Sequence, residues 1–191
     1  MKIRFLSLLA LLGSVCVTQA AETKSSSLAA LREYASGGDV AALRRYEHLV
    51  VQAVKDVAVR ELVEADLVRA LGTNSTFEAK RFACTQLAII GTESSVNATA
   101  ALLKTDETVG IACLALATNP SAKAGQALRN TLDKLKGQPL VQVINTIGNR
   151  RDTAAVRQLR ELTADTDPAV AGASYLALGK IGTSAAQTAL A

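Results

Sequence analysis

The stretch Asp167–Gly182, DPAVAGASYLALGKIG, decides the fold of this chain. Asp167 predicts a helix N-cap because its carboxylate accepts hydrogen bonds from free backbone amides, and Pro168 suits a first helical turn, where its missing N–H costs nothing. Apolar residues then recur at helical spacing, and Gly182 stands where a left-handed residue closes a helix. The stretch therefore predicts a helix that ends at about Ile181, with small packing residues that let similar helices approach closely.

The composition favours an all-helical domain. Of the 191 residues, 49% are hydrophobic, which is ample for a core, whereas only 3% are aromatic and Trp is absent. Ala and Leu dominate, and they favour helices over strands, which are rich in β-branched and aromatic residues. We therefore expect an all-α protein.

Residues 1–20 are typical of a secretory signal peptide. Lys2 and Arg4 precede an apolar run over 5–17, and Thr18-Gln19-Ala20 provides a small-x-small cleavage site. We expect cleavage after this site and export to the periplasm or the extracellular space. Cleavage removes two basic residues, so the formal net charge falls from +4 to +2. This near-neutral balance predicts neither nucleic acid nor a membrane surface as a partner.

Four segments of the chain repeat one pattern: 80–91, 110–120, 139–148 and 173–182. Their superposition makes two sets of positions equivalent, namely Cys84, Cys113, Val141 and Tyr175, and Leu87, Leu116, Ile144 and Leu178. A polar turn and a second amphipathic segment follow each of them. Such hairpins cannot bury an apolar face alone, so we expect about four of them to stack into an α-solenoid over 73–191.

Prolines and glycines mark the ends of the predicted helices. Three prolines are expected at helix starts and three glycines at the ends of first helices, and their structural roles follow from the missing N–H of Pro and the conformational freedom of Gly. These residues are Pro120, Pro139, Pro168, Gly91, Gly148 and Gly182.

The region 28–72 predicts degenerate repeats or a cap, after a flexible leader at 21–27. A short helix is expected over 28–34, and Asp39 is expected to cap a second helix. A third helix over 57–71 is expected to bury five residues, Leu62, Ala65, Leu67, Val68 and Leu71.

DPAVAGASYLALGKIG resembles the HEAT repeats, specifically the short HEAT-like type also found in phycobilisome lyases. KRFACTQLAIIGT and KGQPLVQVINTIGNRRD extend the resemblance to exported multidomain HEAT-repeat proteins of bacteria, over residues 74–191. The resemblance implies an α-solenoid of stacked helical hairpins and a binding role, and it transfers no lyase chemistry, because such scaffolds serve many functions.

Residues that could carry chemistry are few. His48 is the only histidine; it follows Glu47 and has no Cys or second His near it in the sequence, so we predict no catalytic residue, no metal and no cofactor. Cys84 and Cys113 lie at equivalent positions of neighbouring helices, whose axes are about 8–10 Å apart. This is too far for a disulfide, which needs Cα atoms about 4.4–6.8 Å apart, so we expect two buried free thiols.

Two features are candidates for binding. Asn145 lies among apolar residues, so we expect a buried amide that bonds to backbone, with partner binding as the alternative. A basic patch is predicted on the second helices and the turns beside them, at Arg129, Lys134, Arg150, Arg151, Arg157 and Arg160. It would recognise an acidic protein or a polyanionic surface, and the alternative is a solvated face paired with local acids.

The sequence thus predicts an exported, non-catalytic protein-interaction scaffold. The alternative is a non-catalytic repeat segment of a larger exported enzyme or redox protein, since the last second helix is apolar where a solenoid needs a polar cap. On this view the solenoid continues beyond Ala191 or docks something there. The oligomeric state is left open.

Overall fold

The computed structural model describes residues 27–190, so the predicted signal peptide at 1–20 and most of the leader at 21–27 lie outside the described residues. A short helix over 27–33 comes first, close to the expected 28–34. It is followed by α2 (Ala41–Ala53), α3 (Val57–Ala70), α4 (Phe77–Ile90), α5 (Glu93–Ala101), η1 (Leu102–Lys104), α6 (Val109–Thr118), α7 (Ala122–Arg129), α8 (Gly137–Asn149), η2 (Thr153–Ala155), α9 (Val156–Leu162), α10 (Pro168–Ile181) and α11 (Ser184–Leu190).

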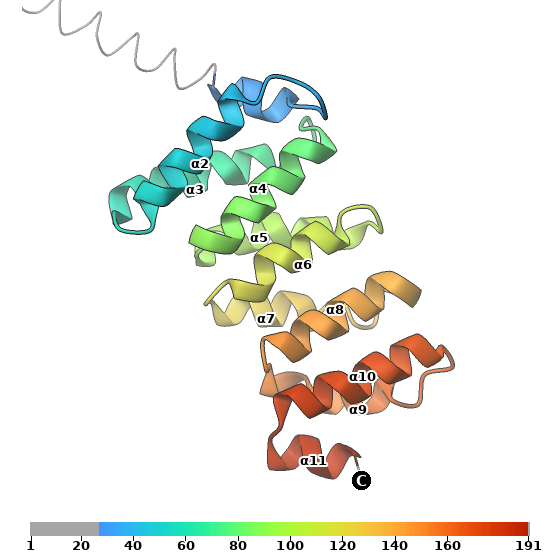
Figure 1. The fold of residues 1–191 in the computed structure, drawn as a ribbon. Coiled ribbons are helices and arrows are strands. Elements are labelled where there is room, and N and C mark those ends of the chain that lie inside the picture. Colours follow the sequence, from blue (N-terminus) through green and yellow to red (C-terminus); the bar gives the residue numbers. More distant parts are fainter. Residues whose placement is uncertain (1–26, 191) are drawn as a thin grey trace, which may run out of the picture.

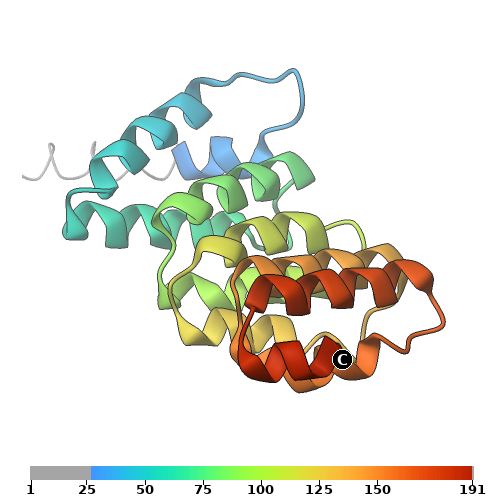
Figure 2. The ribbon, with the colours of Figure 1, turned by 60° about the horizontal axis from the view of Figure 1, so that its bottom comes forward.

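The helices form two layers along one axis. α2, α4, α6, α8 and α10 follow one another in the first layer, and α3, α5, α7, α9 and α11 lie in the second (Figure 1; Figure 2). Each first-layer helix packs against the next one and against at least one helix of the second layer, as repeat units stabilised by nearest-neighbour contacts do. The predicted all-α solenoid of stacked hairpins is confirmed.

Local signals start and end most of these helices. The Asp167 carboxylate accepts a hydrogen bond from the amide of Ala169 at 2.9 Å, and Pro168 is the first residue of α10. Gly182 closes that helix with a φ of 66°, and Gly91 caps α4. Pro139 lies in the first turn of α8. Pro120, expected at a helix start, instead precedes Ser121, which caps α7.

Gly148 does not end its helix, contrary to the prediction, because α8 continues to Asn149. A Cβ at this position would lie 2.8 Å from the Cα of Ala177 and 2.9 Å from its Cβ. Gly148 is therefore the residue that lets α8 and α10 approach closely.

The predicted register of α8 is wrong by about one turn. Ile144 is buried and takes the position of Cys84 and Cys113, whereas Val141 is only half-buried. The equivalent residues Cys84, Cys113, Ile144 and Tyr175 are then spaced by 29, 31 and 31 positions. Ile144 lies 31 positions after Cys113, three more than the predicted equivalent Val141. Each equivalent position in α8 therefore lies three residues later than predicted, so Gly148 falls inside the helix.

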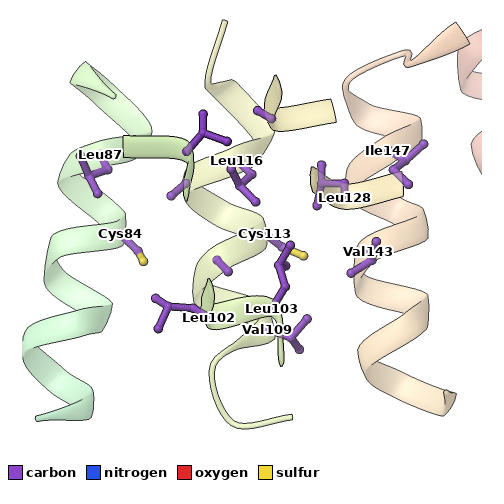
Figure 3. Close-up of a cluster of buried hydrophobic side chains, with 14 of the residues drawn as sticks. Cys84, Leu87, Leu102, Leu103, Val109, Cys113, Leu116, Leu128, Val143 and Ile147 are labelled. Carbon is purple, nitrogen blue, oxygen red and sulfur yellow. The ribbon is translucent and has the colours of Figure 1, made fainter. Parts of the chain in front are cut away.

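The core between the layers is aliphatic with two thiols (Figure 3). Leu87, Leu116 and Ile147 are at most 1% exposed. Cys84 and Cys113 are both free and buried. Burial raises the pKa of the Cys84 thiol to about 12 and also raises the pKa of Cys113, so both thiols pack as small apolar groups.

The hairpin formed by α2 and α3 departs most from expectation. Leu62, predicted to be buried, is 58% exposed, Ala65 is also exposed, and Val68 is half-buried. Two carboxylates are buried in their place, Glu64 and Asp66. Hydrogen bonding explains the difference, since each of these carboxylates has partners that the helical period of the sequence cannot reveal.

Asp39 lies one position farther from its helix than expected. Its carboxylate accepts a hydrogen bond from the amide of Ala41 at 2.9 Å, but Val40 is the residue that immediately precedes α2.

Candidate binding surfaces

Arg150, a member of the predicted basic patch, forms hydrogen bonds within the molecule. Its guanidinium donates hydrogen bonds to the carbonyl oxygens of Leu116, Ala117, Asn119 and Ser121, with N–O distances of 3.3, 2.7 and 3.2 Å for the last three. Leu116 and Ala117 belong to the last turn of α6, and Asn119 and Ser121 follow it, so no amide of this helix remains to bond these carbonyls. Burial lowers the pKa of Arg150. The Arg150 guanidinium therefore caps α6, a role within the molecule that the prediction of a basic patch did not include.

Arg129 is also used internally, because it forms an ion pair with Asp152. Only 22% of the Arg129 side chain and 12% of the Asp152 side chain are exposed. A Cβ at position 125 would lie 2.6 Å from the Asp152 carboxylate, so Gly125 leaves the room that this pair needs. The second carboxylate oxygen of Asp152 accepts a hydrogen bond from the amide of Ala154 at 3.1 Å. The Arg129 guanidinium, like that of Arg150, is therefore engaged within the molecule.

Four of the predicted cations remain on the surface: Lys134, Arg151, Arg157 and Arg160. Arg157 and Arg160 lie one turn apart on α9, and Arg151 precedes this helix with a φ of 51°. α9 lies beside the end of α7, since the Gln158 side chain donates to the carbonyl of Arg129 at 3.4 Å. The surviving cations therefore flank the second layer, without a recorded ion pair among the described residues.

A polar ladder links consecutive hairpins along one edge. The Glu64 carboxylate accepts hydrogen bonds from the Thr92 amide at 2.6 Å and from the Thr92 hydroxyl at 2.8 Å. The Asn119 amide group donates to the Thr92 carbonyl at 2.7 Å, and Arg150 in turn donates to the carbonyl of Asn119. Lys180 continues the series by donating to the Asn149 side chain at 2.8 Å. These contacts hold each repeat in register with the next.

The sequence interpretation placed the buried amide at the wrong asparagine. Asn145 is half-buried and lies on the outer side of α8, whereas Asn119 is 4% exposed and bonds both to Thr92 and to the amide of Ser121 at 3.0 Å. The position of Asn119 directly before Pro120, at a predicted helix boundary, is the signal that could have identified it.

His48 lies on the exposed side of α2, where its ring nitrogen is 3.5 Å from the Gln52 amide nitrogen. The described residues contain no group of three or more His, Cys, Asp or Glu side chains that could hold a metal ion.

The outer side of the first layer is nearly uncharged over α6, α8 and α10. α6 and α8 contain no charged residue, and α10 contains only Lys180. Leu114, Asn145 and Leu176 occupy equivalent positions on these helices, and the two leucines are 48% and 65% exposed. Ile89 on α4 adds a further side chain that is 60% exposed. The outer side of α6, α8 and α10 thus differs in chemistry from the cationic surface at α9.

Comparison with known proteins identifies the repeat. Residues 126–191, from α7 through α11, match the family model described as HEAT repeats. This C-terminal part of the chain therefore consists of HEAT repeats. A search of the curated proteins finds no match for this chain. The match leaves the resemblance to the short phycobilisome-lyase type as a prediction.

HEAT repeats commonly mediate protein–protein interaction. Within residues 27–190, no helix has the length and apolar character needed to cross a membrane.

Proposed function

We propose that this HEAT-repeat chain is an exported, non-catalytic scaffold that binds an acidic protein through the cations beside α9. The observation that carries the proposal is the contrast among the arginines of the predicted patch. Arg129 and Arg150 bond within the molecule, whereas Arg151, Arg157 and Arg160 are exposed without a recorded ion pair among the described residues.

Exposed arginines without internal partners are suited to bind carboxylates. The planar guanidinium presents several donors and bonds a carboxylate through two parallel hydrogen bonds. An ion pair is worth little while both charges are fully solvated, and it gains strength where a partner excludes water. The cations therefore favour an acidic partner whose surface covers α9.

Charge reversal tests this surface. A variant that carries Arg151→Glu, Arg157→Glu and Arg160→Glu is compared with a control of equal charge change, Arg44→Glu, Lys55→Glu and Lys104→Glu, at three exposed cations elsewhere. Each protein is used to capture partners from the exported fraction of cells that express the chain. We expect the first variant to lose a partner that the wild type and the control retain, and this binding should weaken with salt.

Equal capture by all three proteins would contradict the acidic-partner proposal. The nearly uncharged outer side of α6, α8 and α10 would then be the better candidate, and Leu114→Lys should abolish capture in its place. Circular dichroism of each variant ensures that a loss of binding is not a loss of fold.

Export is tested separately. We propose cleavage after Ala20, so N-terminal sequencing of the protein recovered outside the cytoplasm should begin at Ala21. Recovery of an uncleaved chain in the cytoplasm would contradict this part of the proposal.

A further inference from the structure

The last first-layer helix exposes a position that the earlier repeats bury. Cys84, Cys113 and Ile144 occupy this position in α4, α6 and α8, and they are 0%, 6% and 0% exposed. Figure 3 shows the Cys84 sulfur directed toward α6 and the Cys113 sulfur directed toward α8. The equivalent residue of α10 is Tyr175, which is 49% exposed. Tyr175 therefore belongs to a repeat interface that is not covered within the described residues.

The opposite end of the solenoid carries an apolar groove of about 280 Å³ between α2 and α3. Its walls include Leu49, Val59 and Leu62, and Leu62 is 58% exposed. Polar groups of Arg45, Gln52 and Asp66 also line the groove, and Ser27, where the helix over 27–33 begins, lies at its edge. An apolar pocket with a polar rim suits a tyrosine, whose ring is apolar and whose hydroxyl needs a hydrogen-bond partner.

The repeat register shows which side of α2 this groove occupies. The buried residues Tyr46, Val50 and Ala53 of α2 match Ala83, Leu87 and Ile90 of α4, each 37 positions later. Leu49 then corresponds to Gln86 of α4, and Gln52 corresponds to Ile89.

The same position in later repeats faces the preceding first-layer helix. Thr146 of α8 corresponds to Gln86 of α4, and it lies close enough to Cys113 of the preceding helix α6 to lower the pKa of that thiol, against the larger rise that burial causes. Thr118 of α6 corresponds to Ile89 and donates to the carbonyl of Ala88 in α4 at 2.6 Å. The groove at Leu49 and Gln52 is therefore one half of the repeat interface, and α10 presents the other half.

We propose that two copies of this chain associate end to end, with Tyr175 of one copy packed into the α2–α3 groove of the next. The contact continues the series of α4–α6, α6–α8 and α8–α10 interfaces. The only charged residue in α10 and α11 is Lys180, which already bonds to Asn149, so no charge on these helices opposes the approach. One hairpin face is a small interface, so we expect weak association, with a Kd on the order of 10 µM or higher.

This interface joins two different surfaces, so it generates open chains and not a closed pair. Sedimentation velocity of the wild-type chain should therefore show growing species as the concentration rises from about 10 µM to about 1 mM. Tyr175→Lys removes one half of the contact and Leu62→Lys removes the other, so each variant alone should remain monomeric.

Mixing these two variants provides the decisive measurement. The intact α10 end of the Leu62→Lys chain can bind the intact groove of the Tyr175→Lys chain, so the mixture should form 1:1 dimers and nothing larger. Leu176→Lys is the matched control, because this neighbouring residue is 65% exposed on the outer side, and it should associate as the wild type does.

Three results would overturn the proposal. A wild-type chain that stays monomeric to about 1 mM would leave the groove to residues 1–26 or to another protein. Self-association of either single variant would indicate a different or symmetric interface. A mixture that stays monomeric while both variants are folded by circular dichroism would show that the two ends do not fit each other.

Discussion

Two regions of the molecule are packed in different ways. In the α8–α10 interface the two helices lie so close together that there is no room for a Cβ at Gly148, whereas the α2–α3 hairpin buries the carboxylates of Glu64 and Asp66. The first region packs through small and aliphatic residues. The second region uses hydrogen bonds, and it leaves Val51 and Leu62 69% and 58% exposed. Helices thus approach closely where the side chains between them are small. Where an interface buries polar groups such as carboxylates, these groups need hydrogen-bond partners.

The largest effect is expected from a substitution that prevents the close approach of α8 and α10. Gly148→Val should lower the free energy of unfolding by about 3 kcal/mol, because the new side chain collides with the backbone of α10 and must force the helices apart. Urea unfolding followed by circular dichroism measures the change.

Gly172→Ala in α10 is the control for that experiment. A Cβ at Gly172 meets nothing within 4 Å, so alanine should stabilise the helix by about 0.5–1 kcal/mol. Equal losses at both glycines would show that backbone flexibility, and not close packing, is what Gly148 contributes.

The second largest effect is expected from the hydrogen bonds of the buried Glu64 carboxylate in the α2–α3 hairpin. Glu64→Ala should cost about 1.5–3 kcal/mol, because it leaves the amide and hydroxyl of Thr92 without their carboxylate partner. Glu61→Ala removes an exposed carboxylate from the same helix and should change stability by less than about 0.5 kcal/mol. Similar urea midpoints for the two variants would contradict a structural role for Glu64.

A smaller effect is expected at the junction between interior repeats. Asn119→Ala should cost about 1–2 kcal/mol, because the Thr92 carbonyl and the Ser121 amide lose their side-chain partner. Asn145→Ala, at a half-buried position on α8, should cost less than about 0.5 kcal/mol. The reverse order of these two losses would restore Asn145 as the structural amide.

The last effect is a gradual dependence of the free energy of unfolding on pH, through the buried thiol of Cys84. Burial raises the pKa of Cys84 from 9.0 to about 12, so above pH 9 the unfolded chain loses this proton before the folded chain does. The stabilising contribution is complete below about pH 9 and declines toward pH 12, by at most about 1.4 kcal/mol per pH unit. Urea midpoints measured between pH 8 and pH 11 should therefore fall less steeply for Cys84→Ala than for the wild type.

The sequence by itself determined the helices and their order. Caps such as Asp167, prolines at helix starts and the period of apolar residues act over a few neighbouring positions, so they can be read without knowing what packs against the helix. Stacking of the hairpins followed, because a helix with one apolar face has no stable state alone.

Only the tertiary structure decided the register and the use of each polar residue. Gly148 became a contact residue because α10 lies against it, and Arg150 became a cap because the end of α6 offers free carbonyls. Glu64 is buried for the same kind of reason, since Thr92 provides its partners from 28 positions away. The physical reason is that burial and hydrogen bonding depend on distances between residues that are remote in the chain, whereas helix formation depends on residues within about one turn.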